Sequence, residues 1–84
     1  MQVAIVTPTG EVYAGEADAV VGPGSLGEFG VLPGHTAYLS TLREGTVVVR
    51  QGREERRFAI TGGFAEVRDD RVVILADGMA EGPE

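Results

Sequence analysis

The segment from Gly22 to His35 constrains the fold more than any other part of this sequence. It reads GPGSLGEFGVLPGH and carries five glycines and two prolines between two apolar segments. Glycine tolerates positive φ and close approach of other backbones, whereas a proline inside a helix costs about 3 kcal/mol. We therefore expect turns and a chain crossing here, and no helix.

Three glycines of this segment, Gly22, Gly24 and Gly27, also match the G-x-G-x-x-G spacing of dinucleotide-binding proteins. In those proteins the glycines let a pyrophosphate reach the N-terminus of the helix that follows. Pro33 and Gly34 come too soon after the motif for such a helix. The sequence therefore predicts no nucleotide cofactor, and we expect no other cofactor.

The remainder of the chain is a series of short runs of β-branched and aromatic residues separated by turn signals. Residues of these types fit a pleated surface and disfavour helix through their stiff χ1. The runs predict strands at Val3–Thr7, Val12–Ala14, Ala17–Val21, Thr46–Arg50, Arg57–Thr61, Phe64–Arg68 and Arg71–Ala76. We predict an all-β fold, an antiparallel β-sandwich of about nine to ten short strands in two sheets with no substantial helix.

The segment His35–Leu42 is ambiguous, because Tyr38, Leu39 and Leu42 are spaced as on a helix. A single helical turn is marginal by itself, so the residues alone leave helix and strand open.

Two of the expected strands carry apolar residues at consecutive positions, namely Val47–Val49 and Val72–Leu75. One face of every sheet in a two-layer sandwich points outward, so the second apolar face of these strands needs a cover. That cover is either side chains of neighbouring strands or another protein.

Charge and composition exclude several classes of partner. The net charge is −6, from thirteen acidic and seven basic residues, and an acidic surface repels nucleic acid and anionic membranes. No apolar run of about 18 residues is present and the start does not resemble a secretory signal, so we expect a cytoplasmic protein without direct lipid insertion.

The basic residues are all arginines, and four of them cluster with two glutamates. The cluster consists of Arg50, Arg53, Glu54, Glu55, Arg56 and Arg57. It is interpreted either as the solvated end of a hairpin or as an arginine fork for the carboxylates of a partner.

The residues that could carry catalysis are few. The chain has one histidine, no cysteine and no lysine, and His35 with scattered carboxylates does not form a zinc-binding pattern. Ser25 or Ser40 with His35 as base would also need an orienting acid and an oxyanion hole. We predict no catalytic residue and no metal ligand.

Several motifs in the same order resemble one known family. Residues 27–31, Gly-Glu-Phe-Gly-Val, followed by Pro33-Gly34-His35, are similar to a signature of the epsilon subunit of bacterial F-type ATP synthases. Further matches lie at Val6–Gly15, at Thr61–Val67 and at Val73–Asp77. The resemblance extends over residues 3 to 77 and implies a strand in the ambiguous segment.

This resemblance implies a noncatalytic function. Residues 1–77 would be the N-terminal sandwich of the epsilon subunit, a noncatalytic part of the rotor's central stalk, peripheral to the membrane through the ATP synthase complex. Residues 78–84 would be a disordered acidic tail. The C-terminal helical hairpin of most members is missing, so neither its inhibitory role nor its ATP site is expected here.

The resemblance also implies two contact surfaces and their partners. The polar loops of the c-ring would be contacted by Ser25, Leu26, Glu28 and Phe29. The gamma subunit would be contacted by His35, Tyr38, Ser40 and Leu42. The residues alone give other interpretations: for Glu28 a solvated loop carboxylate, for Phe29 a core residue, and for His35 a ring bonded to backbone.

Two alternatives belong to other functional classes. The chain could be a free-standing cytoplasmic β-sandwich that acts as a protein-interaction module, with no connection to a rotor. It could also be a small barrel that binds a metabolite, although an 84-residue sandwich leaves little room for a pocket of about 300 Å³ or more.

Overall fold

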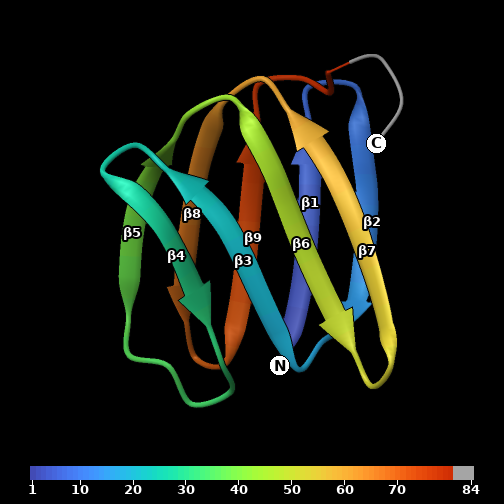
Figure 1. Ribbon diagram of the computed structural model, residues 1–84, viewed down its shortest axis with the longest axis vertical. Coiled ribbons are helices and arrows are strands. Elements are labelled where there is room, and N and C mark those ends of the chain that lie inside the picture. Colours follow the sequence, from blue (N-terminus) through green and yellow to red (C-terminus); the bar gives the residue numbers. More distant parts are fainter. Residues whose placement is uncertain (81–84) are drawn as a thin grey trace.

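The computed structural model describes residues 1–80, and over these residues the chain forms nine β-strands and no helix (Figure 1). The strands are β1 (Gln2–Thr7), β2 (Gly10–Glu16), β3 (Ala19–Gly24), β4 (Gly27–Val31), β5 (Tyr38–Leu42), β6 (Gly45–Gln51), β7 (Glu54–Ile60), β8 (Gly63–Arg68) and β9 (Arg71–Ala76). The prediction of an all-β fold with about nine short strands is confirmed.

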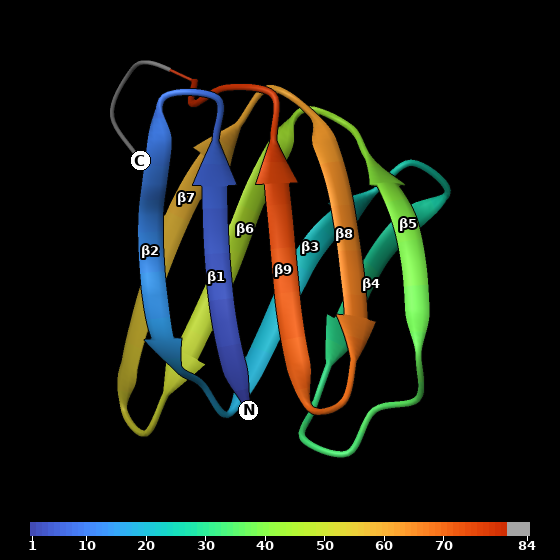
Figure 2. The same cartoon turned by 180° about the vertical axis from the view of Figure 1, so that it is seen from behind.

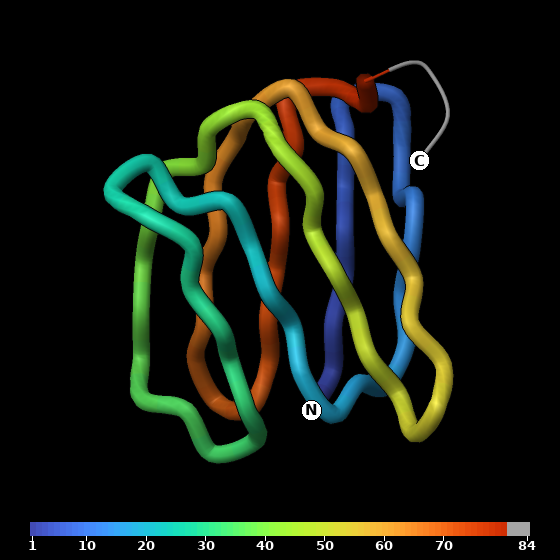
Figure 3. Tube along the Cα trace, in the orientation of Figure 1, coloured from blue at the N-terminus to red at the C-terminus, as the bar shows by residue number. Residues whose placement is uncertain are grey.

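The strands lie in two layers. One layer has the order β2-β1-β9-β8-β5, and the other has the order β4-β3-β6-β7. Figure 2, seen from behind, shows the five-stranded layer in front of the other one. The chain runs up and down between two ends, so that its connections gather at the top and the bottom of the sandwich (Figure 3).

Two details differ from the predicted pair of antiparallel sheets. The layers form one curled sheet, because Gly24 at the end of β3 pairs with Leu42 at the end of β5. In addition, β1 and β9 pair in parallel. A parallel pair needs a long connection, and these two strands are separated by almost the whole chain.

The glycine-rich segment forms a hairpin more regular than the turns and crossing that we expected. Residues 22–24 complete β3 and residues 27–31 form β4, with a tight turn between them. The glycines permit this pairing, since a Cβ on Gly24 would lie 2.5 Å from the carbonyl oxygen of Gly27. The absence of a helix in this segment is confirmed.

The segment His35–Leu42, for which the residues alone left helix and strand open, is a strand from Tyr38 onward. Its first three residues belong to the loop between β4 and β5.

Residues 78–80 belong to the segment that we expected to be a disordered tail, and they lie beside the end of β7. The amide of Thr61, directly after β7, donates to the carbonyl of Gly78 at 3.0 Å, and the amide of Ala80 donates to the carbonyl of Ala59 in β7 at 2.9 Å. Residues 81–84 of that tail lie outside the described residues.

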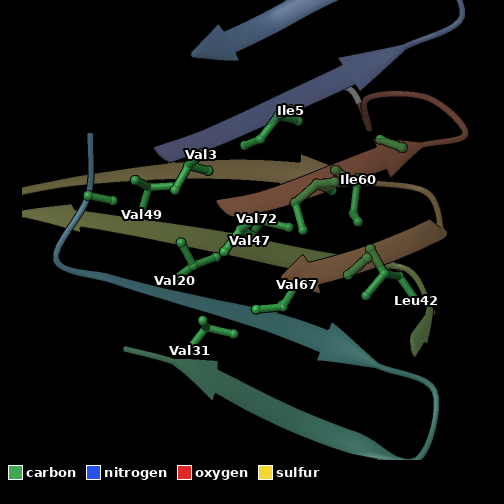
Figure 4. Packing of buried hydrophobic residues seen from close by; sticks show 14 of the residues in the cluster. Val3, Ile5, Val20, Val31, Leu42, Val47, Val49, Ile60, Val67 and Val72 are labelled. Atoms are coloured by element: carbon green, nitrogen blue, oxygen red, sulfur yellow. The ribbon is translucent and has the colours of Figure 1, made fainter. Parts of the chain in front are cut away.

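The core fills the space between the layers with valine and isoleucine (Figure 4). Burial alternates along the strands, as in β9, where Val72, Ile74 and Ala76 point inward. Fully burying such a side chain stabilises the fold by about 1.5–3 kcal/mol. Two aromatic pairs lie beside the core, Tyr13 with Phe58 and Phe29 with Tyr38, each with ring centroids 5.4 Å apart.

Candidate partner-binding surfaces

The turn between β3 and β4 presents exposed side chains at one end of the sandwich. Leu26 at its tip is fully exposed, and Ser25 and Glu28 are exposed beside it. The turn is tied to β5, because the Ser25 amide donates to the carbonyl of Thr41 at 2.9 Å and the Thr41 hydroxyl donates to Ser25 Oγ at 2.8 Å. The side chain of Leu26 is therefore exposed at the tip of a turn whose base is fixed to β5 by hydrogen bonds.

Phe29 has a different position from its neighbours in the sequence. Its ring is half-buried against the core, above Gly22 and beside Tyr38. The side chain supports the hairpin from inside, while Glu28 on the opposite face of β4 points outward. The structure thus brings Ser25, Leu26 and Glu28 together on the surface and separates Phe29 from them.

The residues predicted to face gamma lie along β5 and the loop before it. His35 is half-buried in that loop, with Nδ1 2.6 Å from the carbonyl oxygen of Thr36, and its ring lies edge-on to Tyr38 at 6.1 Å. Tyr38 is 39% exposed. Ser40 is half-buried and its hydroxyl donates to the carbonyl of Thr41 at 2.8 Å. The side chain of Leu42 is in the core.

A larger surface, which we did not assign to a site from the sequence, covers the outside of the five-stranded layer. We call it the five-stranded face, and its apolar side chains are Ala4, Val6, Ala14, Leu39, Phe64, Val73 and Leu75. Leu39 is 61% exposed and Leu75 is 50% exposed. The signal in the sequence was the run of apolar residues in β9, which needs a cover on both sides.

Strand register arranges this face in rows across the layer. Ala14, Ala4, Val73, Glu66 and Leu39 lie opposite one another on successive strands. Because Ala14 and Ala4 have small side chains, the surface of this row is recessed over β2 and β1 relative to its β5 end, where Leu39 lies.

Four shallow hollows open onto the five-stranded face or its rim. The largest of the four has a volume of about 380 Å³ and is lined by Glu66, Arg68, Asp69, Arg71 and Val73. Hollows of this kind receive side chains of a partner more readily than they enclose a small ligand, because they are open and shallow.

The arginine cluster lies on the hairpin of β6 and β7, away from this face. Glu55 binds two of its arginines, with Arg57 Nη2 at 2.6 Å and Arg50 Nε at 3.1 Å. Hydrogen bonds from Arg57 and then Arg50 hold the pKa of Glu55 below its usual value. Arg56 lies over the ring of Tyr13, with its Cζ 5.9 Å from the ring centroid. Three of the four arginines therefore have contacts within the chain, which favours the interpretation as a solvated hairpin end.

Two features are absent from the part of the chain that the structure describes, a metal-binding group of side chains and a membrane-spanning helix. Residues 1–80 contain no group of three histidine, cysteine, aspartate or glutamate side chains that could hold a metal ion. Within the same range no helix is long and apolar enough to cross a membrane.

Comparison with known sequences identifies the family. Residues 1–82 match the profile described as "ATP synthase, Delta/Epsilon chain, beta-sandwich domain". The chain belongs to this family. The resemblance of its motifs to the epsilon subunit is thereby confirmed, and the sandwich is the expected architecture of this ATP synthase domain.

Two curated relatives illustrate the similarity. The "ATP synthase epsilon chain" of Helicobacter pylori (strain P12) is 46% identical over 78 residues, which are 93% of this chain and 63% of the relative. The "ATP synthase epsilon chain 2" of Syntrophotalea carbinolica is 43% identical over 77 residues, which are 92% of this chain and 56% of the relative. The chain thus spans about three fifths of the length of these relatives.

Solved structures of the ATP synthase contain chains with the same fold. A chain in the Euglena gracilis mitochondrial ATP synthase, a structure of OSCP, F1 and c-ring, aligns with a TM-score of 0.85 and 26% identity, covering 93% of this chain and 51% of that one. A chain in the central stalk and c-ring of the Tetrahymena thermophila enzyme aligns with a TM-score of 0.79 and 18% identity, covering 95% of this chain and 65% of that one.

Proposed function

We propose that this epsilon-type domain is a noncatalytic part of the central stalk, which binds the gamma subunit and the polar loops of the c-ring and so couples ion-driven rotation to ATP synthesis. Membership in the ATP synthase family supports this proposal, together with the similarity of the fold to chains in solved ATP synthase structures that include a central stalk and a c-ring. The domain would work on the cytoplasmic side, attached to the membrane through the complex and without a cofactor.

The observation that carries the proposal is the five-stranded face. Its exposed leucines, Leu39 on β5 and Leu75 on β9, lie on either side of β8, which carries the half-buried Phe64. Half-buried Val73 lies on β9 with Leu75.

Five strands spaced about 4.8 Å apart and about 20 Å long give a face of about 480 Å², roughly three fifths of the about 800 Å² that one partner contributes to a standard interface. We assign this face to gamma. His35, Tyr38 and Ser40 would reach gamma only at the open edge of β5, because Tyr38 and Ser40 lie opposite the buried Val67 and Ala65 and so point to the inner side of the layer.

Leu42 contributes to the proposed gamma contact only indirectly. Its side chain is 6% exposed and packs in the core, on the same side of β5 as Tyr38 and Ser40. Its contribution is the position of β5.

The c-ring contact is assigned to the turn between β3 and β4. Ser25, Leu26 and Glu28 are its exposed residues, and Phe29 fixes the hairpin beneath them. A turn at the end of a layer meets a partner at a different angle from the outer face, so one rigid body can hold two neighbours at once. A sheet transmits force between them because its hydrogen-bond ladder resists shear.

A double comparison tests the two surfaces. Leu75→Asp places a charge on the five-stranded face, and we expect at least a tenfold weaker affinity for gamma, about 1.4 kcal/mol. Leu26→Asp introduces the same charge at the turn, and we expect gamma affinity to stay unchanged while crosslinking to the c-ring falls. Equal gamma affinity of both variants would contradict the assignment of the face.

Glu28→Arg tests the turn in the assembled enzyme. We expect weaker ATP-driven proton pumping by the reconstituted complex with little change in the stability of the domain. Unchanged pumping would count against a c-ring contact at this residue. If the wild-type chain retains neither gamma nor the c-ring, the adaptor alternative replaces the stalk function.

A further inference from the structure

We infer that Arg71 is the specificity contact of the five-stranded face and binds a carboxylate of the partner that docks there. The inference rests on the proposed function, since the partner is the stalk subunit that covers this face. It adds the chemistry by which the face would select one arrangement of that partner.

Arg71 lies at the junction of two hollows. It lines the hollow formed with Glu66, Arg68 and Asp69, and also the neighbouring one formed with Ala4 and Ala14 on β1 and β2. In the strand register it stands opposite Gln2 of β1 and Arg68 of β8. It lies two residues before Val73, the β9 residue of the row that contains Ala4 and Ala14. A partner side chain that enters either hollow therefore meets its guanidinium.

Most charged neighbours of Arg71 contact other groups, whereas Asp69, which lines the same hollow, forms no ion pair within residues 1–80. Arg68 Nε lies 3.8 Å from a carboxylate oxygen of Glu66. Glu16 accepts a hydrogen bond from the side chain of Gln2 and pairs with the ammonium of Met1. Asp70 lies 4.0 Å from the same ammonium and accepts the Gly34 amide at 3.1 Å. Among the ion pairs of residues 1–80, Arg71 takes part in none.

An unpaired arginine beside small apolar side chains has a particular use in an interface. The alanines and Val73 allow a partner backbone to approach closely, which removes water from the guanidinium. Arginine then forms short, two-pronged hydrogen bonds with a carboxylate, and such contacts are enriched among residues that dominate binding. The partner element would therefore carry small apolar side chains followed by an aspartate or glutamate.

The overall charge makes this contact selective. Because the chain carries a net charge of −6, an acidic side chain of a partner is repelled over most of the surface. The hollow at the end of the five-stranded face is balanced in formal charge, because Glu66 and Asp69 line it together with Arg68 and Arg71. Attraction of an acidic side chain there therefore depends on its direct contact with the guanidinium of Arg71. Electrostatic complementarity of this kind sets orientation and register more than affinity.

The test compares Arg71→Glu and Arg71→Gln with Arg53→Glu, in the full chain with the purified gamma subunit of the same ATP synthase. Arg53 is an exposed arginine on the hairpin of β6 and β7, so its reversal gives the same change in net charge at a distant site. We expect gamma affinity to fall at least tenfold for Arg71→Glu, less for Arg71→Gln, and less than twofold for Arg53→Glu. The salt dependence of binding should weaken in Arg71→Gln.

Two further results separate the possible failures. Aspartate-to-lysine and glutamate-to-lysine variants of gamma are screened with Arg71→Glu, and one of them should restore its binding. The inference is overturned if Arg71→Glu binds gamma as tightly as Arg53→Glu does, with equal denaturation midpoints for both. If the wild-type chain does not bind gamma at all, the proposed function itself fails.

Discussion

The ring of Phe29 lies directly over Gly22, and a Cβ built on that glycine would be 2.7 Å from Cζ of the phenyl ring. The two residues are opposite each other on β4 and β3. The missing side chain of Gly22 is thus the space in which Phe29 packs, and the ring in turn closes this side of the sandwich against Tyr38.

Gly22→Ala should therefore destabilise the domain by about 1–3 kcal/mol, because the ring must move out of a well-packed position. Chemical denaturation measures the change. Gly30→Ala is the matched control on the same hairpin, since a Cβ there meets nothing within 4 Å, and its effect should stay within about 0.5 kcal/mol. The packing argument would fail if both variants were equally stable. Adding Phe29→Leu to Gly22→Ala should recover part of the loss.

A second glycine prediction concerns the corner between β7 and β8. At Gly63 φ is +145°, and a Cβ would lie 2.1 Å from the carbonyl oxygen of Leu75 on the neighbouring strand. Gly63→Ala should cost more than about 3 kcal/mol, since backbone strain and backbone overlap act together. The expected readout is a large fall in the denaturation midpoint or loss of soluble protein.

Gly27→Ala serves to distinguish backbone strain from steric overlap as the cause of the loss expected for Gly63→Ala. Gly27 has a φ of +141°, similar to that of Gly63, but a Cβ there has open space around it. It should therefore cost only the conformational strain, about 1–3 kcal/mol. Equal losses for the two variants would show that the approach of Leu75 is unimportant.

Local sequence signals were enough to predict most of the fold. Turn residues such as Asp69 and Asp70, both at positive φ, separate strands whose residues alternate in burial. The parallel pairing of β1 with β9 could not be predicted in this way, because it joins residues that are far apart in the chain and leaves no local signal.

The candidate surfaces were predicted less completely. The exposed turn with Leu26 followed from its glycines and its resemblance to a family motif. The core position of Leu42 did not follow, because the phase of a short strand decides which of its residues point inward, and one step reverses it. For the same reason the apolar run ending at Leu75 indicated that a cover was needed without revealing which strands share the exposed face.

The ion pairs on the hairpin of β6 and β7 give a prediction about pH. Because Arg57 and Arg50 lower the pKa of Glu55 in the folded chain, these contacts favour folding above the unfolded pKa. Their contribution is lost as the pH falls through the lower folded pKa. Arg57→Gln should raise the pKa of Glu55 toward its ordinary value, as measured by NMR titration of the side-chain carboxyl carbon. Arg53→Gln is the control, and a similar rise there would contradict a specific contact.

The last prediction concerns Asp70, which connects three parts of the chain at the bottom of the sandwich. Its φ is +59°, its Oδ1 accepts the amide of Gly34 at 3.1 Å, and its carbonyl accepts the amide of Gln2 at 3.1 Å. Asp70→Ala should destabilise the domain by about 1–2 kcal/mol, because it removes the acceptor and disfavours the left-handed backbone. Asp70→Asn keeps an acceptor and tolerates that backbone, so its loss should be smaller.

Asp69→Ala isolates the contribution of the backbone, since Asp69 has a φ of +53° in the same turn. Amide hydrogen exchange gives the decisive measurement, because Gly34 lies in the loop that carries His35. Exchange at Gly34 should accelerate in Asp70→Ala and remain slow in Asp69→Ala. If the two variants exchange alike, the carboxylate of Asp70 does not hold this loop, and the position of His35 at the edge of the proposed gamma contact must depend on its own contacts with Thr36 and Tyr38.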